Sequence, residues 1–322
     1  MLAAAAGGCG GGDGGPATLT VYVSAPLHGA GAAEGRAIVD GAKLALAGHD
    51  RVGQLRIRAV YLDDTGGGAK WSPVATAANA RRAAEDSSAI GYIGDVDSGA
   101  TRVSLPITNQ ADIAQISPAS TAIDLTREAG GVDPDDYRPS DDQTFARVVP
   151  ANDVQARAAG LLKRQGAGRV AISPDGSHDP TPCPPAGALF ISPFRDPSRL
   201  VDPPAQGARA LATPGAAYGY EAMSLLLDAI RRAGESGDDR GSVVDEVLST
   251  RDRRSIIGEY SIDGNGDTTL DLVSVYRVRS CSLVFDRELK ANGLNPGTSA
   301  DLTVASILAV GLENMVTDFA SS

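Results

Sequence analysis

The sequence predicts an α/β fold built on parallel sheets with helices on both faces. Strand-like and helix-like segments alternate along the chain from Thr18 onward, which is typical of repeated βα units. The chain has 322 residues, and 42% of them are hydrophobic, enough for one large domain or for two lobes with buried cores. We therefore expect a globular protein whose ligand site lies at the carboxyl ends of the parallel strands.

Runs rich in β-branched and apolar residues predict the first four strands. The runs are Leu19–Leu27, Leu55–Asp64, Ala89–Asp95 and Ala111–Ser117. Helices are expected between them. Ala33–Ala47 carries apolar residues at helical spacing, Ser72 followed by Pro73 is a cap and first-turn proline, and a third helix begins near Ser98. The segment "PASTAIDLT" after Ser117 predicts a fourth helix start.

Charge and composition exclude several classes of partner. The net charge is −11 and no stripe of Lys and Arg is present, so the sequence does not indicate a nucleic-acid binder. Aromatic residues make up only 4% of the chain, too few for a stacking platform. No run approaches about 18 uninterrupted apolar residues, so we expect contact with the membrane only through a lipid anchor.

The first residues predict that anchor. "AGGC" (Ala6–Cys9) resembles the lipobox of bacterial lipoproteins and is followed by a Gly-rich linker, so Cys9 is the candidate for lipidation. The alternative is a low-complexity Ala/Gly tail. Cys183 and Cys281 remain, and we expect two free thiols, with a disulfide as the alternative that an extracytoplasmic location would allow.

Small polar residues gather where two neighbouring strands end. Asp95, Asp97, Ser98 and Thr101 follow the third strand, and Ala119, Ser120 and Thr121 follow the fourth. Ligands of parallel sheets bind at this edge, where helix N-termini present unpaired amides. Two such corners with hydroxyl and amide donors predict a site for a carboxylate. The alternative is that Ser98 and Thr121 are ordinary N-caps.

Several blocks in fixed order resemble a known family. They are "VYVSAPLHGAGAAEGRAIVDGAKLALA", "YLDD", "YIGDVDSGATRVSLPITNQADIAQISPASTAIDLT", "FARVVPANDVQARAA" and "YGYEAMSLLLDAI". Together they resemble the type I periplasmic binding proteins, in particular the branched-chain amino acid substrate-binding proteins of ABC transporters. The resemblance covers Leu19 to about Ala159 strongly and Tyr218 to about Phe285 moderately. It implies a two-lobed extracytoplasmic lipoprotein that binds an amino acid and delivers it to ABC permease subunits.

The family also implies ligand-binding residues. Its amino acid backbone is held by a Ser after the third strand and an Ala-Thr corner after the fourth, which match Ser98 and the run Ala119, Ser120 and Thr121. Glu34 stands where the family often has a Tyr. With Asp95 and Asp97 nearby, a carboxylate at this place would favour a ligand with extra positive charge or hydroxyl groups over a plain aliphatic amino acid. The alternative is that Glu34 simply suits the N-terminus of its helix.

The second lobe departs from the family. After Gly168–Ile172 the chain runs directly into "SPDGSHDPTPCPPAG", where Asp175 matches an acid that faces the ligand ammonium group. At least one βαβ unit of roughly 30 residues is missing. We therefore expect a truncated second lobe, a loop-rich segment from Ser173 to Pro214, and weak binding or none.

The expected organisation has six parts. They are a lipoprotein signal remnant and linker (1–17), lobe 1 (18–147), a truncated lobe 2 (148–214), a return to lobe 1 (215–255), closing strands and a hairpin (256–287), and an atypical C-terminal extension (288–322). Within the extension, Asp301–Phe319 has helical apolar spacing. An Asn-Gly turn is expected to form the hairpin between "IIGEYSI" and "LVSVYRV".

We expect no enzyme, cofactor or metal site. "GAGAAEG" has Glu34 where a dinucleotide fingerprint needs its third Gly, and "DGNGDTTLD" lacks the Gly and Glu of a calcium loop. The histidines are His28, His49 and His178, and none has partners at metal-ligand spacing. Besides transport, a sensory or regulatory binding module of the same fold and a degenerate non-binding fragment remain open.

Overall fold

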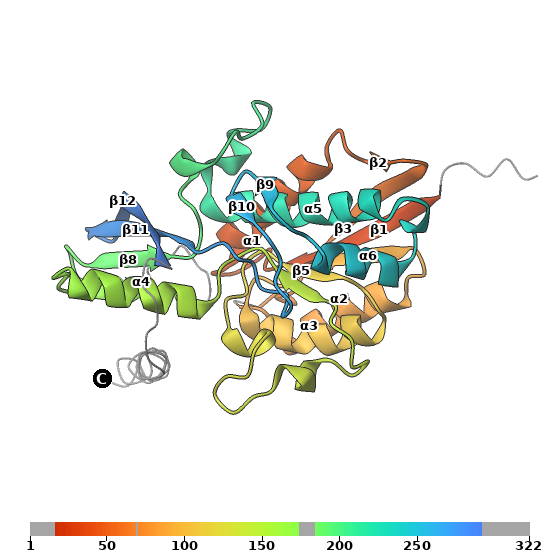
Figure 1. Ribbon diagram of the computed structural model, residues 1–322, viewed down its shortest axis with the longest axis horizontal. Helices are drawn as coiled ribbons and strands as arrows, with labels where there is room; N and C mark the ends of the chain where they lie inside the picture. The colour runs from red at the N-terminus through yellow and green to blue at the C-terminus, as the bar shows by residue number, and fades with distance from the viewer. Residues whose placement is uncertain (1–16, 69, 174–183, 292–322) are drawn as a thin grey trace, which may run out of the picture.

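The protein forms two lobes of unequal size (Figure 1), seen here in a computed structural model. The structure describes residues 17–68, 70–173 and 184–291. Cys9, Asp175, Cys183 and the expected helix Asp301–Phe319 lie outside these ranges. No helix within them is long and apolar enough to cross a membrane.

The first lobe is organised around a six-stranded sheet. The strand order is β2-β3-β1-β4-β5-β6, and all neighbours are parallel except β2, which forms a short antiparallel hairpin with β3. The strands are β1 (Thr18–Ala25), β2 (Arg51–Val52), β3 (Leu55–Asp63), β4 (Ala89–Ile93), β5 (Gln115–Ser117) and β6 (Phe145–Arg147). The four predicted strands are therefore confirmed as β1, β3, β4 and β5, and the first lobe has the predicted parallel sheet.

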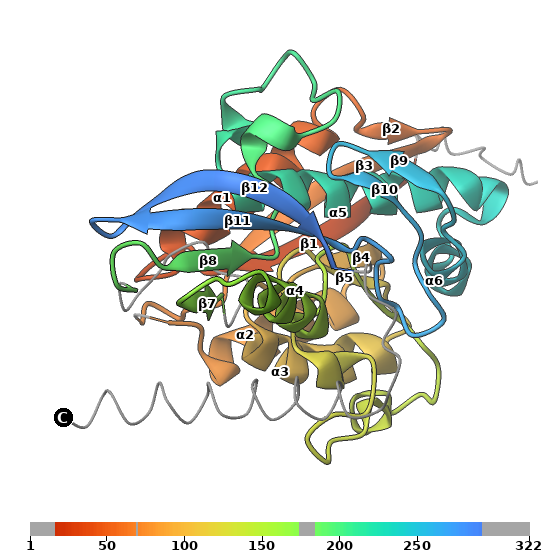
Figure 2. The same cartoon turned by 60° about the vertical axis from the view of Figure 1, so that its left-hand side comes forward.

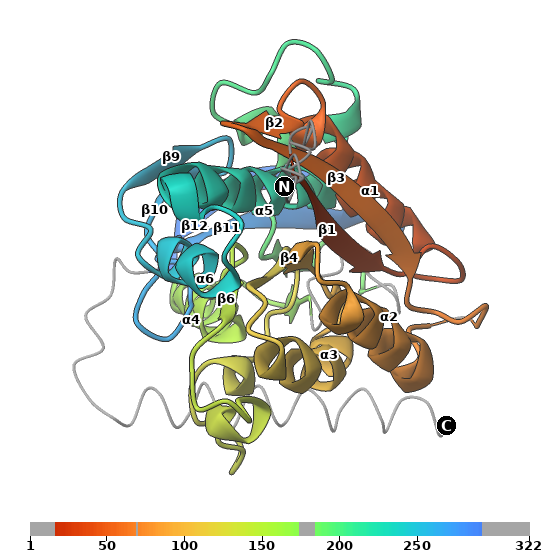
Figure 3. The ribbon, with the colours of Figure 1, turned by 90° about the vertical axis from the view of Figure 1, so that its right-hand side faces the viewer.

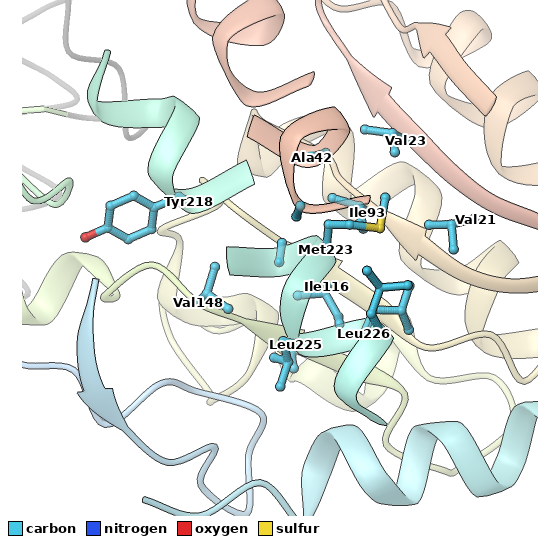
Figure 4. Packing of buried hydrophobic residues seen from close by; sticks show 14 of the residues in the cluster. Val21, Val23, Ala42, Ile93, Ile116, Val148, Tyr218, Met223, Leu225 and Leu226 are labelled. Carbon is cyan, nitrogen blue, oxygen red and sulfur yellow. The ribbon is translucent and has the colours of Figure 1, made fainter. Parts of the chain in front are cut away.

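Helices cover both faces of this sheet (Figure 3). One face packs on α1 (Ala32–Leu46), α5 (Pro214–Arg232) and α6 (Arg240–Leu248), and the other on α2 (Pro73–Glu85) and α3 (Ser98–Gln110). Figure 4 shows the main core, in which Val21 and Ile116 of the strands meet Met223 of α5. All three are fully buried, so this layer supplies the hydrophobic stabilisation of the lobe.

Glycines let two of the helices approach closely. A Cβ on Gly41 of α1 would overlap the carbonyl oxygen of Ala216, and a Cβ on Gly219 of α5 would overlap that of Ile38. Backbone meets backbone at this crossing because neither glycine carries a side chain. The crossing joins α1 to α5, which pack against each other although they lie far apart in the sequence.

The second lobe has a four-stranded sheet in the order β12-β11-β8-β7 (Figure 2). The strands are β7 (Val170–Ile172), β8 (Leu189–Ser192), β11 (Leu272–Arg279) and β12 (Ser282–Lys290). The expectation of a parallel sheet here holds only for β7 and β8, because β8 pairs with β11, and β11 with β12, in antiparallel fashion. One helix, α4 (Asn152–Arg164), packs on this sheet within the described residues.

Two local predictions are wrong. The segment after β5 forms only the 3₁₀ turns Ile123–Leu125 and Pro134–Tyr137, so no second α-helix begins at Thr121. The Asn-Gly turn is closed by a bridge between Ile262 and Thr268, but the strands beside it go to different sheets. β10 (Gly258–Tyr260) pairs with β9 (Arg253–Ser255), and β11 joins the second lobe. The predicted hairpin therefore does not form.

The expected free thiol at Cys281 is also wrong. Cys281 is disulfide-bonded, and its partner lies outside the described residues. Ser280 and Cys281 form the two-residue turn between β11 and β12, with positive φ angles of 48° and 62°. Two consecutive positive φ angles match the twist of a hairpin, which explains this tight connection. The disulfide therefore attaches the tip of the β11–β12 hairpin to another part of the chain.

Candidate ligand-binding corner of the first lobe

The predicted polar residues meet at the carboxyl edge of the first sheet. β4 and β5 are parallel neighbours, so the chain leaves both at the same edge. Ser98 begins α3 just after β4, and residues 119–122 follow β5. We call Ser98 together with residues 119–122 the ligand corner.

Ser98 connects the two halves of the ligand corner. Its Oγ accepts hydrogen bonds from the backbone amides of Thr121 and Ala122, at 3.2 and 3.1 Å. The described residues provide no acceptor for the Ser98 hydroxyl proton, and Ser98 keeps 5% of its surface exposed. A hydroxyl that accepts two amide bonds is polarised toward donating its own proton. Ser98 can therefore donate to an anion at the N-terminus of α3.

A second serine hydroxyl holds the other amides of the corner. Ser117 Oγ accepts from the amides of Ala119 and Ser120, at 3.3 and 2.9 Å, and donates to the carbonyl of Asp95. The expectation of open amides after β5 is therefore wrong, because serine hydroxyls already accept from all four amides of residues 119–122. Hydroxyl groups, rather than a second helix N-terminus, shape this half of the corner.

Ser120 points its hydroxyl into the first lobe. Its Oγ lies 2.6 Å from the Oγ1 of Thr101 and donates to the Asp95 carbonyl at 3.0 Å. Both hydroxyls are fully buried. They belong to a polar network behind the corner that also includes Ser104, whose hydroxyl donates to the Asp95 carboxylate.

Two buried carboxyl groups lie close to the corner. Burial raises the pKa of Asp95 to about 6, although bonds from Ser104 and Tyr92 lower it in part. Burial raises the pKa of Asp64, just beyond β3, to about 8, and the negative charges of Asp95, Asp63 and Asp97 add to the effect. Neither carboxyl oxygen of Asp64 has a hydrogen-bond partner in the described residues. The raised pKa favours the protonated, neutral form of Asp64 near neutral pH.

The other predicted site residues occupy separate places. Asp97 caps α3 and accepts from the Gly99 amide at 2.6 Å. Glu34 lies half-buried in the first turn of α1, and its Cγ would be 3.4 Å from a Cβ on Gly215 at the start of α5. Both follow carboxyl ends of neighbouring strands, β4 and β1. Asp175 lies outside the described residues.

The sequence reasoning missed Arg147, the last residue of β6. Its side chain is fully buried and donates to the carbonyl oxygens of Ser120 and Ala122. The available signal was an arginine inside the apolar strand "FARVV", where the pattern favours a buried apolar residue.

Two cavities of the described chain lie away from the corner. One of about 340 Å³ is at the outer end of the second lobe, where Arg169, Arg277 and Arg287 contribute to its lining. The other, about 380 Å³, is a shallow apolar hollow beside α3, lined in part by Pro106 and Ile107. Neither of these two cavities is lined by residues of the ligand corner.

Sequence comparisons match a known family over only a short part of the chain. No curated protein matches the chain. Residues 271–318 match the family described as CitG: ATP:dephospho-CoA triphosphoribosyl transferase. This match spans much less than half of the chain, and its described part, 271–291, contains β11 and β12 of the second sheet.

Solved structures resemble the chain over most of its length. A leucine binding protein from Thermotoga maritima is 20% identical, with a TM-score of 0.68 over 86% of this chain and 100% of that one. An ABC transporter substrate-binding protein from Desulfitobacterium hafniense, in complex with Leu, is 18% identical, with a TM-score of 0.64 over 83% and 99%. A solute binding protein of an ABC transporter from R. palustris, in complex with 4-hydroxybenzoate, is 14% identical, with a TM-score of 0.62 over 85% and 96%. The chain therefore has the two-lobed fold of the type I periplasmic binding proteins, and the described part of its second lobe is small, a four-stranded sheet with helix α4.

Proposed function

We propose that the chain is the extracytoplasmic solute-binding lipoprotein of an ABC transporter and that it binds an amino acid between its lobes for import. The observation that carries this proposal is the Ser98 hydroxyl, which accepts from two amides of the corner and donates to no group among the residues that the structure describes. The ligand carboxylate would lie against this hydroxyl at the N-terminus of α3. Each charge-assisted hydrogen bond there contributes about 1.5 to 3 kcal/mol.

The bound ligands of similar structures support a carboxylate. One neighbour holds Leu and another holds 4-hydroxybenzoate. These ligands differ in size, charge and aromaticity, but both carry a carboxylate group. A serine hydroxyl at a helix N-terminus suits that shared part and leaves the rest of the ligand to other residues.

We also propose Cys9 as the lipid attachment point and ABC permease subunits as partners. The Gly-rich linker after Cys9 would tether the folded lobes to the outer face of the cytoplasmic membrane. Mass spectrometry of the protein from a membrane fraction tests the anchor. A thioether-linked lipid on Cys9 supports it, and an unmodified thiol there contradicts it.

The ligand itself is best sought by an unbiased thermal-shift screen followed by calorimetry. A ligand that binds the native state raises Tm by mass action. We expect a small carboxylate to do so, with a Kd above the micromolar range because the second lobe is small. Sub-micromolar affinity would contradict the weak-binding expectation, and no response to any carboxylate would contradict the proposed function.

Specificity is tested by comparing leucine with arginine. Glu34 and Asp97 both follow the carboxyl edge of the first sheet, and their charges would favour a ligand with additional positive charge. We therefore expect arginine to bind more tightly than leucine. A clear preference for leucine would end this part of the proposal.

A further inference from the structure

A buried arginine lies directly behind the ligand corner. Arg147 Nη1 donates to the carbonyl oxygens of Ser120 and Ala122, at 3.2 and 2.6 Å. Its side chain is 0% exposed, so all of its donors face protein groups. A fully buried guanidinium is costly to place and needs a dense set of partners.

The peptide geometry connects Arg147 to the amides of the corner. A carbonyl group and the amide that follows it lie in one plane. The Ser120 carbonyl therefore shares a rigid unit with the Thr121 amide, which donates to Ser98 Oγ. When Arg147 holds that carbonyl from behind, it also sets the direction in which the amide points.

The next peptide unit is held in the same way from the second lobe. The Thr121 carbonyl accepts from the amide of Asn152, the first residue of α4, at 2.8 Å. The amide in that unit belongs to Ala122, which also donates to Ser98 Oγ. Each amide that polarises Ser98 is thus fixed through the carbonyl group of the same peptide unit, which belongs to the preceding residue.

Asp267 holds the guanidinium of Arg147 in place. Arg147 Nε lies 2.7 Å from Asp267 Oδ1, and its Nη2 donates to Thr126 Oγ1 at 2.7 Å. The other oxygen of Asp267 accepts from Arg127 Nε at 3.0 Å. Arg147 therefore meets four groups in fixed directions, which suits a planar guanidinium and not the single ammonium group of lysine.

We propose that Arg147 is the positioning residue of the ligand corner and that Asp267 fixes its orientation. The proposal rests on the proposed function, because it assigns Arg147 a part in ligand affinity without contact with the ligand. The competing explanation is that Arg147 and Asp267 are a buried ion pair that only stabilises the fold.

Arg240 offers a matched control for that competing explanation. It begins α6 and donates to the carbonyl oxygens of Ala89, Ala111 and Asp86, at 2.9, 2.9 and 2.7 Å. Like Arg147, it therefore holds backbone carbonyls of the first lobe. These carbonyls lie before β4 and β5 begin or at the first residue of β4, at the opposite edge of the sheet from the ligand corner.

The test compares Arg147→Lys, Asp267→Asn and Arg240→Lys by hydrogen exchange and calorimetry. We expect Arg147→Lys to speed amide exchange of Thr121 and Ala122 in the ligand-free protein. With L-arginine, L-leucine and 4-hydroxybenzoate as probes, we expect affinity to fall about tenfold or more, equivalent to about 1.4 kcal/mol. Asp267→Asn should change both readouts in the same direction, and Arg240→Lys should change neither.

The outcomes separate the two proposals. If wild type binds a probe and Arg147→Lys binds it equally well in the folded fraction, the positioning role is wrong and the proposed function stands. If wild type binds none of the three probes, the transport proposal loses its support, and exchange at Thr121 and Ala122 still decides whether Arg147 fixes the corner. Should Arg147→Lys fail to fold, unchanged exchange in Asp267→Asn would overturn the inference.

Discussion

Ser98 Oγ lies 3.2 Å from the amide nitrogen of Thr121, and this contact joins the start of α3 to the loop after β5. The two residues are 23 positions apart in the sequence. Parallel pairing of β4 with β5 brings them together, because both strands end at the same edge of the sheet. Among the described residues no acceptor takes the Ser98 hydroxyl proton, and a polarised hydroxyl at a helix N-terminus is the chemical basis of the proposed carboxylate site.

Replacement of Ser98 by Ala should weaken both binding and folding. The variant leaves the Thr121 and Ala122 amides without their acceptor, so we expect the free energy of unfolding to fall by roughly 1 to 3 kcal/mol. It also removes the proposed donor to the carboxylate, so affinity for any carboxylate that binds wild type should fall at least tenfold. Chemical denaturation and calorimetry measure the two effects.

Ser88→Ala is the matched control for Ser98→Ala. Ser88 also makes hydroxyl bonds within the first lobe, to Thr20 and Asp86, but it lies before β4 rather than after it. We expect this variant to lose stability and to keep its affinity. Equal affinity losses in the two variants would show that Ser98 acts only through stability.

Much of the first lobe could be predicted because its signals are local. The cap at Ser72 and the proline at Pro73 marked the start of α2, and the neighbouring strand ends placed Ser98 near Thr121. The loop after β5 could not be predicted in this way. Its amides bind the hydroxyls of Ser98 and Ser117, and these tertiary contacts replace the bonds that a helix would have made.

The roles of the buried charged residues could not be predicted from the sequence either. Asp64 looks like an ordinary polar residue at a strand end, and the position of Arg147 in an apolar run indicates burial but not its partners. The Arg147 guanidinium has several fixed partners, whereas the Asp64 carboxyl oxygens have no hydrogen-bond partner within the described residues. Such differences arise from packing between segments that are distant in the sequence.

Asp64 should make stability depend on pH. Burial raises its folded-state pKa to about 8, above the ordinary value of 3.8 for an aspartate. The native state therefore retains a proton that the unfolded state releases, and stability should fall as pH rises from about 4 to about 8. The fall is at most about 1.4 kcal/mol per pH unit. Thermal denaturation between pH 5 and pH 8.5 measures it.

Asp64→Asn should flatten that dependence, because a side chain of similar size stays neutral throughout. The expected gain in Tm over wild type is therefore larger at pH 8.5 than at pH 5. A residual slope from Asp95, with its pKa of about 6, should remain in the variant below about pH 6. Asp40→Asn, on the exposed face of α1, is the control and should run parallel to wild type. Parallel curves for Asp64→Asn would contradict the buried neutral acid.

Cys281→Ser should lower Tm, because the disulfide of Cys281 restrains the hairpin tip in the unfolded chain as well as in the folded one. A native disulfide typically contributes about 2 to 5 kcal/mol. Reductant should lower the Tm of wild type by a similar amount and leave that of the variant unchanged. A wild-type Tm that does not respond to reductant, measured with full reduction confirmed by thiol titration, would contradict a stabilising disulfide.

Gly219→Ala should be among the most damaging single changes in the first lobe. The new Cβ would overlap the Ile38 carbonyl oxygen, so α1 and α5 would have to separate and the core around Met223 would loosen. Overpacking of this kind costs about 1 to 3 kcal/mol or more.

Gly160→Ala on α4 is the control, since its Cβ would meet only the end of the Arg164 side chain, at 3.5 Å. That change should be neutral or stabilising by up to about 1 kcal/mol, as expected for alanine in a helix. Denaturant unfolding of both variants measures the difference, and equal stabilities would mean that the α1–α5 crossing is not as close as described.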